Sequence, residues 1–133
     1  MANGTIAFDT LQTSGQITGT AKSVDTDYVV NGSAKVWSQF DGSSFGLRDS
    51  FNVSGITDNG TGDYTVTFNN DMAGASNYST SGNAGQFSGA AFNDVFCFHK
   101  TIAAGSIGVQ VIDAGGTIRD QTYVNCIIHG DLA

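Results

Sequence analysis

A pair of alternating segments around a tight reversal restricts the fold of this chain more than any other feature of its sequence. The segments Phe51–Ile56 and Tyr64–Phe68 flank Asp58–Asp63, which contains the dipeptide Asn59-Gly60. Asn-Gly between two alternating segments is a strong hairpin signal, because both residues accept the positive φ angles of a tight turn. The later segment alternates large apolar residues with threonine, so one of its faces is apolar. The sequence therefore predicts an antiparallel hairpin with one buried face.

The kinds of residue in the chain extend this prediction to the whole molecule. Val, Ile, Thr and Phe number 10, 9, 14 and 9, against 3 Leu, 3 Lys and no Glu. The first group favours strands. The second normally fills the faces of amphipathic helices, so no long helix is expected. The absence of Pro leaves strand edges without their commonest block, and those edges must be closed or covered by partners.

Four more strands follow from the alternation of apolar residues and from the turn-forming residues between them. They are expected at Val36–Phe40, Val95–Lys100, Ile107–Ile112 and Tyr123–His129. In the first strand, Trp37 and Gln39 lie on the face opposite to Val36 and Phe40. Strands this rich in apolar residues are typical of two packed sheets or of a subunit interface. The predicted fold is an all-β antiparallel β-sandwich, a jelly-roll-like knob of residues 34–133.

Residues 1–33 form a second part of the chain, in which apolar residues are spaced more widely. Tyr28–Val30 precede a turn that is expected at Asn31-Gly32. This segment has little apolar surface to bury by itself, so it is expected to be an extended arm or short strands that need a neighbour. We interpret it as an N-terminal attachment arm. Its apolar contact residues are Ile6, Phe8, Leu11 and Ile17.

The charge and the hydropathy pattern of the chain exclude two classes of partner. The formal net charge is −7, and the five basic residues are scattered along the chain. A surface of this charge repels nucleic acid. The apolar runs are far shorter than a bilayer span, and the N-terminus lacks the basic and apolar regions of a secretory signal. No nucleic-acid or membrane partner is expected.

The cysteines and histidines do not follow a reactive or metal-binding pattern. Cys97 and Cys126 each lie in an apolar run and not in a CxxC pair. Buried reduced thiols are therefore expected, with a single disulfide as the alternative. His99 and His129 have no Cys or His at ligand spacing, so they are expected at the surface or at an interface.

The acidic residues do not form a recognisable metal site or catalytic motif. Asp25–Asp27 and Asp58–Asp63 place oxygen atoms close together, but their spacing differs from that of an EF-hand, and turn formation explains them. The sequence contains no Glu and no HExxH motif. A polysaccharide depolymerase could use paired Asp residues, but its groove needs wide sheets. We assign no catalytic residue, no metal and no other cofactor.

Four segments together carry a resemblance to a known group of proteins. They are Asn31–Trp37, the run Arg48–Phe68 that contains the hairpin, Ile107–Ile112 and Val124–Asp131. These segments resemble tail-fibre and related virion proteins of tailed bacteriophages, especially marine ones, over roughly residues 28–131. In that family the block is a compact β-rich knob at the end of a fibre and is typically trimeric. The resemblance implies a homotrimeric virion component that is assembled in the bacterial host cytoplasm and takes part in host attachment.

Three functions remain open at this point. The first is a tail-fibre tip or short spike module that binds a host receptor, which includes a bacterial surface glycan as a candidate. The second is a decoration protein that stabilises the capsid or tail, and the third is a fragment of a polysaccharide-degrading tailspike. Only the arm of residues 1–33 precedes the knob, so no fibre shaft is expected, and the arm would bind other phage virion proteins.

A long polar segment is the predicted receptor-binding site. Residues Asn69–Phe87 consist mostly of Asn, Ser, Gly, Ala and Thr, which predicts a long loop with at most one short strand around Tyr78. Loops of this length usually carry function, and a mixture of amides and aromatic rings suits sugar rings. The candidate residues are Asn77, Tyr78, Asn83 and Phe87. The alternative is that the two aromatic side chains are buried in the core.

Overall fold

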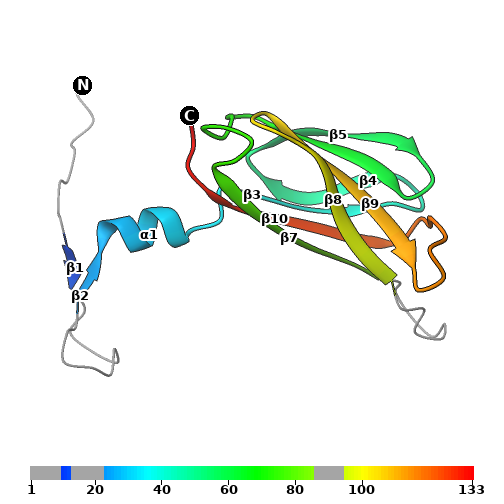
Figure 1. The fold of residues 1–133 in the computed structure, drawn as a ribbon, viewed down its shortest axis with the longest axis horizontal. Coiled ribbons are helices and arrows are strands. Elements are labelled where there is room, and N and C mark those ends of the chain that lie inside the picture. Colours follow the sequence, from blue (N-terminus) through cyan, green and yellow to red (C-terminus); the bar gives the residue numbers. More distant parts are fainter. Residues whose placement is uncertain (1–9, 13–22, 86–94) are drawn as a thin grey trace. The chain divides into compact units, whose positions relative to one another are not determined.

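The computed structural model describes residues 10–12, 23–85 and 95–133, and the chain divides into two compact units, Met1–Ser33 and Ala34–Ala133. The predicted all-β antiparallel β-sandwich is confirmed for the second unit (Figure 1). Its strands are β3 (Val36–Asp41), β4 (Gly46–Phe51), β5 (Val53–Gly60), β6 (Asp63–Phe68), β7 (Tyr78–Gly85), β8 (Val95–Ala103), β9 (Ser106–Asp113) and β10 (Tyr123–Gly130).

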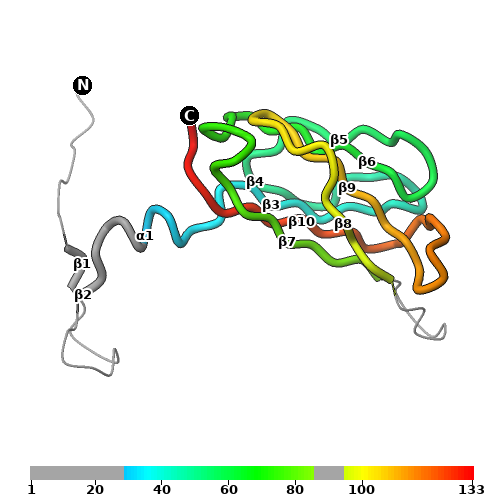
Figure 2. The backbone as a smooth tube through the Cα atoms, viewed as in Figure 1, coloured from blue at the N-terminus to red at the C-terminus, as the bar shows by residue number. Residues whose placement is uncertain are grey.

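The strands form two antiparallel four-stranded sheets, in the orders β4-β3-β10-β7 and β5-β6-β9-β8. Each sheet combines strands that are distant in the sequence. In the first sheet the C-terminal strand β10, red in Figure 2, lies between β3 and β7. A jelly roll likewise has eight strands in two packed sheets. The edge strands of the first sheet are β4 and β7, and those of the second are β5 and β8.

The inward faces of the two sheets supply one hydrophobic core. The predicted alternation is confirmed in β3, where Val36 and Phe40 are buried, and in β6 and β9, where every second residue is buried. Burial of apolar side chains on facing sheets is the main favourable term in folding such a domain. The buried apolar residues are Val36, Phe40, Tyr64, Val66, Phe68, Met72, Ile107, Val109, Val111, Val124, Cys126 and Ile128.

An aromatic pair links the two sheets within this core. The rings of Phe40 on β3 and Tyr64 on β6 meet edge to face, with 5.0 Å between their centroids. The Tyr64 hydroxyl lies 2.7 Å from Asp120 Oδ1 and 3.0 Å from the carbonyl oxygen of Gly42. Burial is the main reason why the pKa of Tyr64 is raised, followed by the bond to Asp120. The hydroxyl is therefore satisfied inside the core.

The chain crosses from one sheet to the other at Asn52, and here the expected strand Phe51–Ile56 was wrong. Phe51 ends β4, whereas Val53 begins β5 in the other sheet. Asn52 has a φ of 57°, a left-handed conformation that Asn tolerates better than most residues. Its side chain binds Asn70, since Asn52 Oδ1 accepts from the Asn70 amide at 2.8 Å and Asn52 Nδ2 donates to the Asn70 carbonyl oxygen at 3.2 Å. Strand β4 itself was not predicted.

The expected long loop Asn69–Phe87 was also wrong in its second half. Tyr78–Gly85 form the eight-residue strand β7, which pairs with β10 over its whole length. Its residues have little intrinsic preference for strands, so the pairing with the apolar strand β10 determines the conformation. The loop that is left runs from residue 69 to residue 77.

The first unit contains short elements instead of a uniformly extended arm. Strands β1 (Thr10–Gln12) and β2 (Ser23–Asp25) pair antiparallel, and α1 (Thr26–Gly32) follows. The expected extended conformation of Tyr28–Val30 was therefore wrong. The helix ends at Gly32, a residue common at helix C-termini, and the Ser33 hydroxyl donates to the Val29 carbonyl oxygen. Of the proposed arm contacts, Leu11 lies in β1, while Ile6, Phe8 and Ile17 lie outside the described residues. In the described part of the chain, no helix has the length and hydropathy needed to span a membrane.

Candidate functional site

The outer face of the β4-β3-β10-β7 sheet carries two parallel rows of side chains. In the polar row, Asp49 on β4 is paired with Gln39 on β3, Gln39 with Asn125 on β10, and Asn125 with Asn83 on β7. In the apolar row, two positions along the strands, Phe51 is paired with Trp37 and Trp37 with Ile127. Residues two positions apart on a strand lie on the same face. Both rows therefore face outward, away from the core residues that alternate with them.

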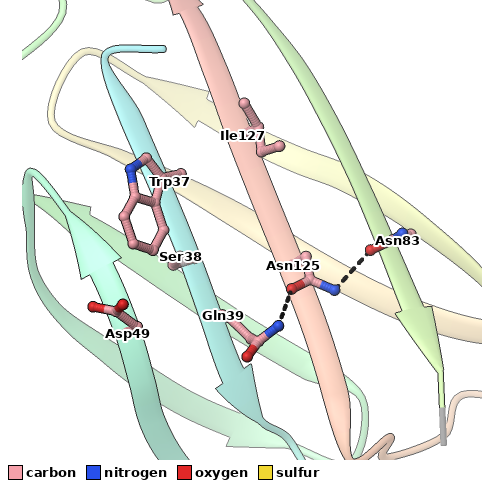
Figure 3. Close-up of a pocket in the computed structure, with 7 residues that line it drawn as sticks. All are labelled: Trp37, Ser38, Gln39, Asp49, Asn83, Asn125 and Ile127. Atoms are coloured by element: carbon pink, nitrogen blue, oxygen red, sulfur yellow. Dashed lines mark hydrogen bonds between the residues drawn. The ribbon is translucent and has the colours of Figure 1, made fainter.

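Hydrogen bonds join three amides of the polar row into one chain (Figure 3). Gln39 Nε2 donates to Asn125 Oδ1 at 3.1 Å, and Asn125 Nδ2 donates to Asn83 Oδ1 at 2.7 Å. Because each bond requires the neighbouring amide in one orientation, the three side chains fix each other. The row is thus ordered before any ligand arrives.

The two rows line a shallow hollow of about 410 Å³, a volume in the range of small-ligand sites. Figure 3 shows the side chains of Trp37 and Ile127 on one side of the polar row, with Asp49 at its β4 end. Phe51 and Ile127 are 55% and 40% exposed. Large apolar side chains next to ordered amides at a surface are typical of recognition sites. The hollow therefore combines flat apolar surface with directional hydrogen-bonding groups.

Tyr123 lies two positions before Asn125 on β10, on the side of the polar row away from the apolar row, and Arg48 packs on its ring. The Arg48 guanidinium lies 4.1 Å from the centroid of the Tyr123 ring and 2.7 Å from Asp41 Oδ2. The backbone amide of Ser44 and the Arg48 guanidinium hold the pKa of Asp41 down, at about 2. The positive charge of Arg48 is thereby compensated by Asp41. The polar row itself carries one formal charge, the carboxylate of Asp49.

The structure describes three of the four predicted binding residues, and one of these three lies in this hollow. Asn83 is in the polar row. Asn77 precedes β7, and its backbone atoms bond to Gly74 and Asp131. The Tyr78 hydroxyl donates to the Ala103 carbonyl oxygen at 2.8 Å, and its ring packs edge to face on Phe68, so this side chain belongs to the partly buried margin of the core. Phe87 lies outside the described residues.

Of the other chemical groups singled out in the sequence, His129 lies on this outer face, two positions beyond Ile127 on β10. The cysteines, His99 and Asp58 lie elsewhere. Cys97 and Cys126 are both free thiols, as expected, and burial raises their pKa values to about 11 and about 12. His99 is partly buried, with Nδ1 2.8 Å from Thr80 Oγ1, and burial lowers its pKa. Asp58 accepts a turn hydrogen bond from the Gly60 amide. Within the described ranges, no three His, Cys, Asp or Glu side chains gather as metal ligands.

Sequence reasoning missed five residues as site residues, namely Trp37, Gln39, Asp49, Asn125 and Ile127. Part of the signal was present, because the alternation in β3 already placed Trp37 and Gln39 on the face opposite to the core. A single amide in the apolar run of β10 was another sign. What could not be read was the register that aligns β4, β3, β10 and β7, since it joins distant segments, as in the pair of Gln39 and Asn125, which are 86 positions apart. Comparison with protein-family models, with curated proteins and with solved structures found no match to this chain.

Proposed function

We propose that this chain is a non-enzymatic attachment module of a bacteriophage virion, which contacts the host surface with the outer face of its β4-β3-β10-β7 sheet. The observation that carries the proposal is the polar row, in which three hydrogen-bonded amides lie beside exposed apolar side chains in a hollow. An ordered surface of this kind binds with little loss of side-chain entropy. The resemblance of residues 28–131 to virion proteins of tailed phages supplies the biological setting.

The two units of the chain receive different roles in this proposal. The sandwich of residues 34–133 presents the binding face, and residues 1–33 attach the module to other virion proteins. Three copies in the particle would present the face three times, and several weak contacts would then act together on one cell surface. The module itself is expected to bind without changing its target.

Adsorption of the phage that encodes this chain provides the test. The purified protein should occupy host receptors and slow adsorption of the phage, because protein and virion use the same surface. The double variant Asn83→Ala, Asn125→Ala should lose this competition. The matched control Asn59→Ala removes an exposed amide from β5, the edge strand of the other sheet that lies opposite to β8, and should compete like the parent.

Either of two results would contradict the proposal and favour another function. Unchanged adsorption, together with antibody labelling of the capsid shell, would favour the decoration protein that stabilises the particle. Release of reducing ends from host capsule by the purified protein would favour the polysaccharide-degrading tailspike fragment.

A further inference from the structure

We infer that the ligand of the hollow is an uncharged glycan, whose sugar ring lies against the apolar row while its hydroxyl groups bond to the polar row. This inference rests on the proposed attachment function and adds the chemical class of the ligand and the role of each row. It is argued from three properties of the face: its hydrogen-bonding capacity, its spacing and its charge.

The amides of the polar row can serve groups that both donate and accept hydrogen bonds. The bonds within the row use one N–H of Gln39, the oxygen and one N–H of Asn125, and the oxygen of Asn83. A side-chain amide has two N–H donors and an oxygen with two lone pairs. Each of the three amides therefore retains at least one donor and one acceptor site. A sugar hydroxyl, which donates once and accepts twice, can donate to the oxygen of such an amide or accept from its N–H.

The spacing of the two rows suits a molecule with one apolar face and a polar rim. Two positions along a strand correspond to about 6.7 Å, and four neighbouring strands extend over about 14 Å. A pyranose ring presents C–H groups on its faces and hydroxyls around its rim. A ring placed over Trp37 and Ile127 would therefore bring its rim toward Gln39 and Asn125, and the length of the row has room for further sugar units.

The charges of the face disfavour an anionic ligand. Asp49 lines the hollow, and the formal net charge of the chain is −7. Arg48, which neighbours Asp49 on β4, is paired with Asp41 and lies over Tyr123, while Lys35 lies two positions before Trp37, at the apolar row and not at the polar one. Sulfate, phosphate or uronate groups would be repelled here without a counter-charge. An uncharged glycan meets no such penalty.

A protein partner fits this face less well than a glycan does. Specific protein interfaces bury roughly 800 Å² on each partner around an apolar centre that is poor in charge. Here three apolar side chains, Phe51, Trp37 and Ile127, border a strip of amides that ends in a carboxylate. The small hollow and the polar strip favour a narrow ligand that is rich in hydroxyls.

Binding of defined oligosaccharides to the full chain tests the inference. An array should carry uncharged hexose and N-acetylhexosamine oligosaccharides beside uronate-bearing and phosphate-bearing ones, and calorimetry should give Kd for any hit. We expect binding to uncharged members only, with a Kd that changes little when the salt concentration is raised, because screening affects charged pairs. Asn125→Ala should weaken binding about tenfold, because it removes the hydrogen bonds that hold the neighbouring amides Gln39 and Asn83 in place. Trp37→Ala should weaken it at least as much, and Trp37→Phe should retain most of the affinity.

Controls separate this inference from the proposed function. Asn59→Ala should bind like the parent, and circular dichroism should show that each variant is folded. Preferential binding of anionic oligosaccharides, or equal binding by the parent and Asn125→Ala, would overturn the inference. Competition with phage adsorption in the absence of any glycan binding would refute the glycan but leave the attachment function standing. Glycan binding without competition with phage adsorption would support the uncharged glycan as ligand and refute the attachment function.

Discussion

At the scale of single residues, the close approach of β7, β8 and β10 depends on a missing side chain at Gly82. A Cβ atom at this position would lie 2.6 Å from the Asn125 carbonyl oxygen, 3.0 Å from His99 Nε2 and 3.1 Å from Cys97 Sγ. The first of these atoms belongs to the backbone of the paired strand and cannot move alone. Gly82 also stands directly before Asn83, so the packing at this glycine supports one end of the polar row.

Gly82→Ala is expected to destabilise the sandwich by about 1–3 kcal/mol, because the added methyl group overpacks the space between three strands. Urea denaturation followed by circular dichroism measures the change. Gly85→Ala is the matched control, since a Cβ on this residue of the same strand meets no atom within 4 Å. The control should stay within about 0.5 kcal/mol of the parent. Equal urea midpoints of unfolding for Gly82→Ala and Gly85→Ala would contradict the tight packing at Gly82.

At the scale of elements, the corner between β4 and β5 decides which residues belong to which sheet. The left-handed conformation of Asn52 turns the chain, and its hydrogen bonds to Asn70 tie the corner to the end of β6. The turn separates Phe51, which enters the apolar row, from Val53, which packs against the core. One backbone angle thus places one aromatic ring on the binding face.

Two substitutions at Asn52 separate the conformation from the hydrogen bonds. Asn52→Gly keeps the left-handed backbone at low cost but loses the side-chain bonds, whereas Asn52→Ala loses both. We expect the alanine variant to be less stable than the glycine variant by about 1 kcal/mol or more. Chemical denaturation of the two proteins gives this difference directly. A glycine variant no more stable than the alanine variant would mean that the backbone angle stores no strain.

The elements also show what could be predicted from the sequence and what could not. The strands β3, β8, β9 and β10 and the antiparallel pairing of β5 with β6 were predicted, because their apolar alternation is a local signal. The turn between β5 and β6 was expected at Asn59-Gly60 but lies at Thr61-Gly62. Strand β7 was missed because Ser, Thr, Gly and Asn carry no such signal, and its conformation comes from pairing with β10. Asn83 was singled out for its amide alone. Its partners Gln39 and Asn125 could not be found without the register, which is a property of the assembled sheet.

At the scale of the whole molecule, the second sheet presents a separate apolar surface along its edge strand β8. Phe96, Phe98 and Ile102 are each nearly half exposed, and among the described strands β8 has a partner on one side alone. Exposed apolar edges of this kind are normally covered by other chains. The binding face and the β8 surface lie on different sheets, so assembly through β8 would leave the hollow open.

We expect the purified chain to be a homotrimer, and light scattering should give a mass three times that of one chain. Phe98→Asp should reduce the mass by placing a charge in the covered surface. Phe51→Asp, a change of the same kind on the binding face, should leave the mass unchanged. A parent protein that remains a clean monomer at micromolar concentration would refute the homotrimer.

The chain contains a single tryptophan, Trp37, and this residue lines the hollow. All indole fluorescence of the molecule therefore originates at the proposed binding face, and the emission of the unlabelled protein reports the polarity of that one place. A sugar ring that displaces water from the indole should shift the emission to shorter wavelength. Occupancy of the site can then be followed by spectroscopy in solution, in any assembly state and in the presence of other proteins that lack tryptophan.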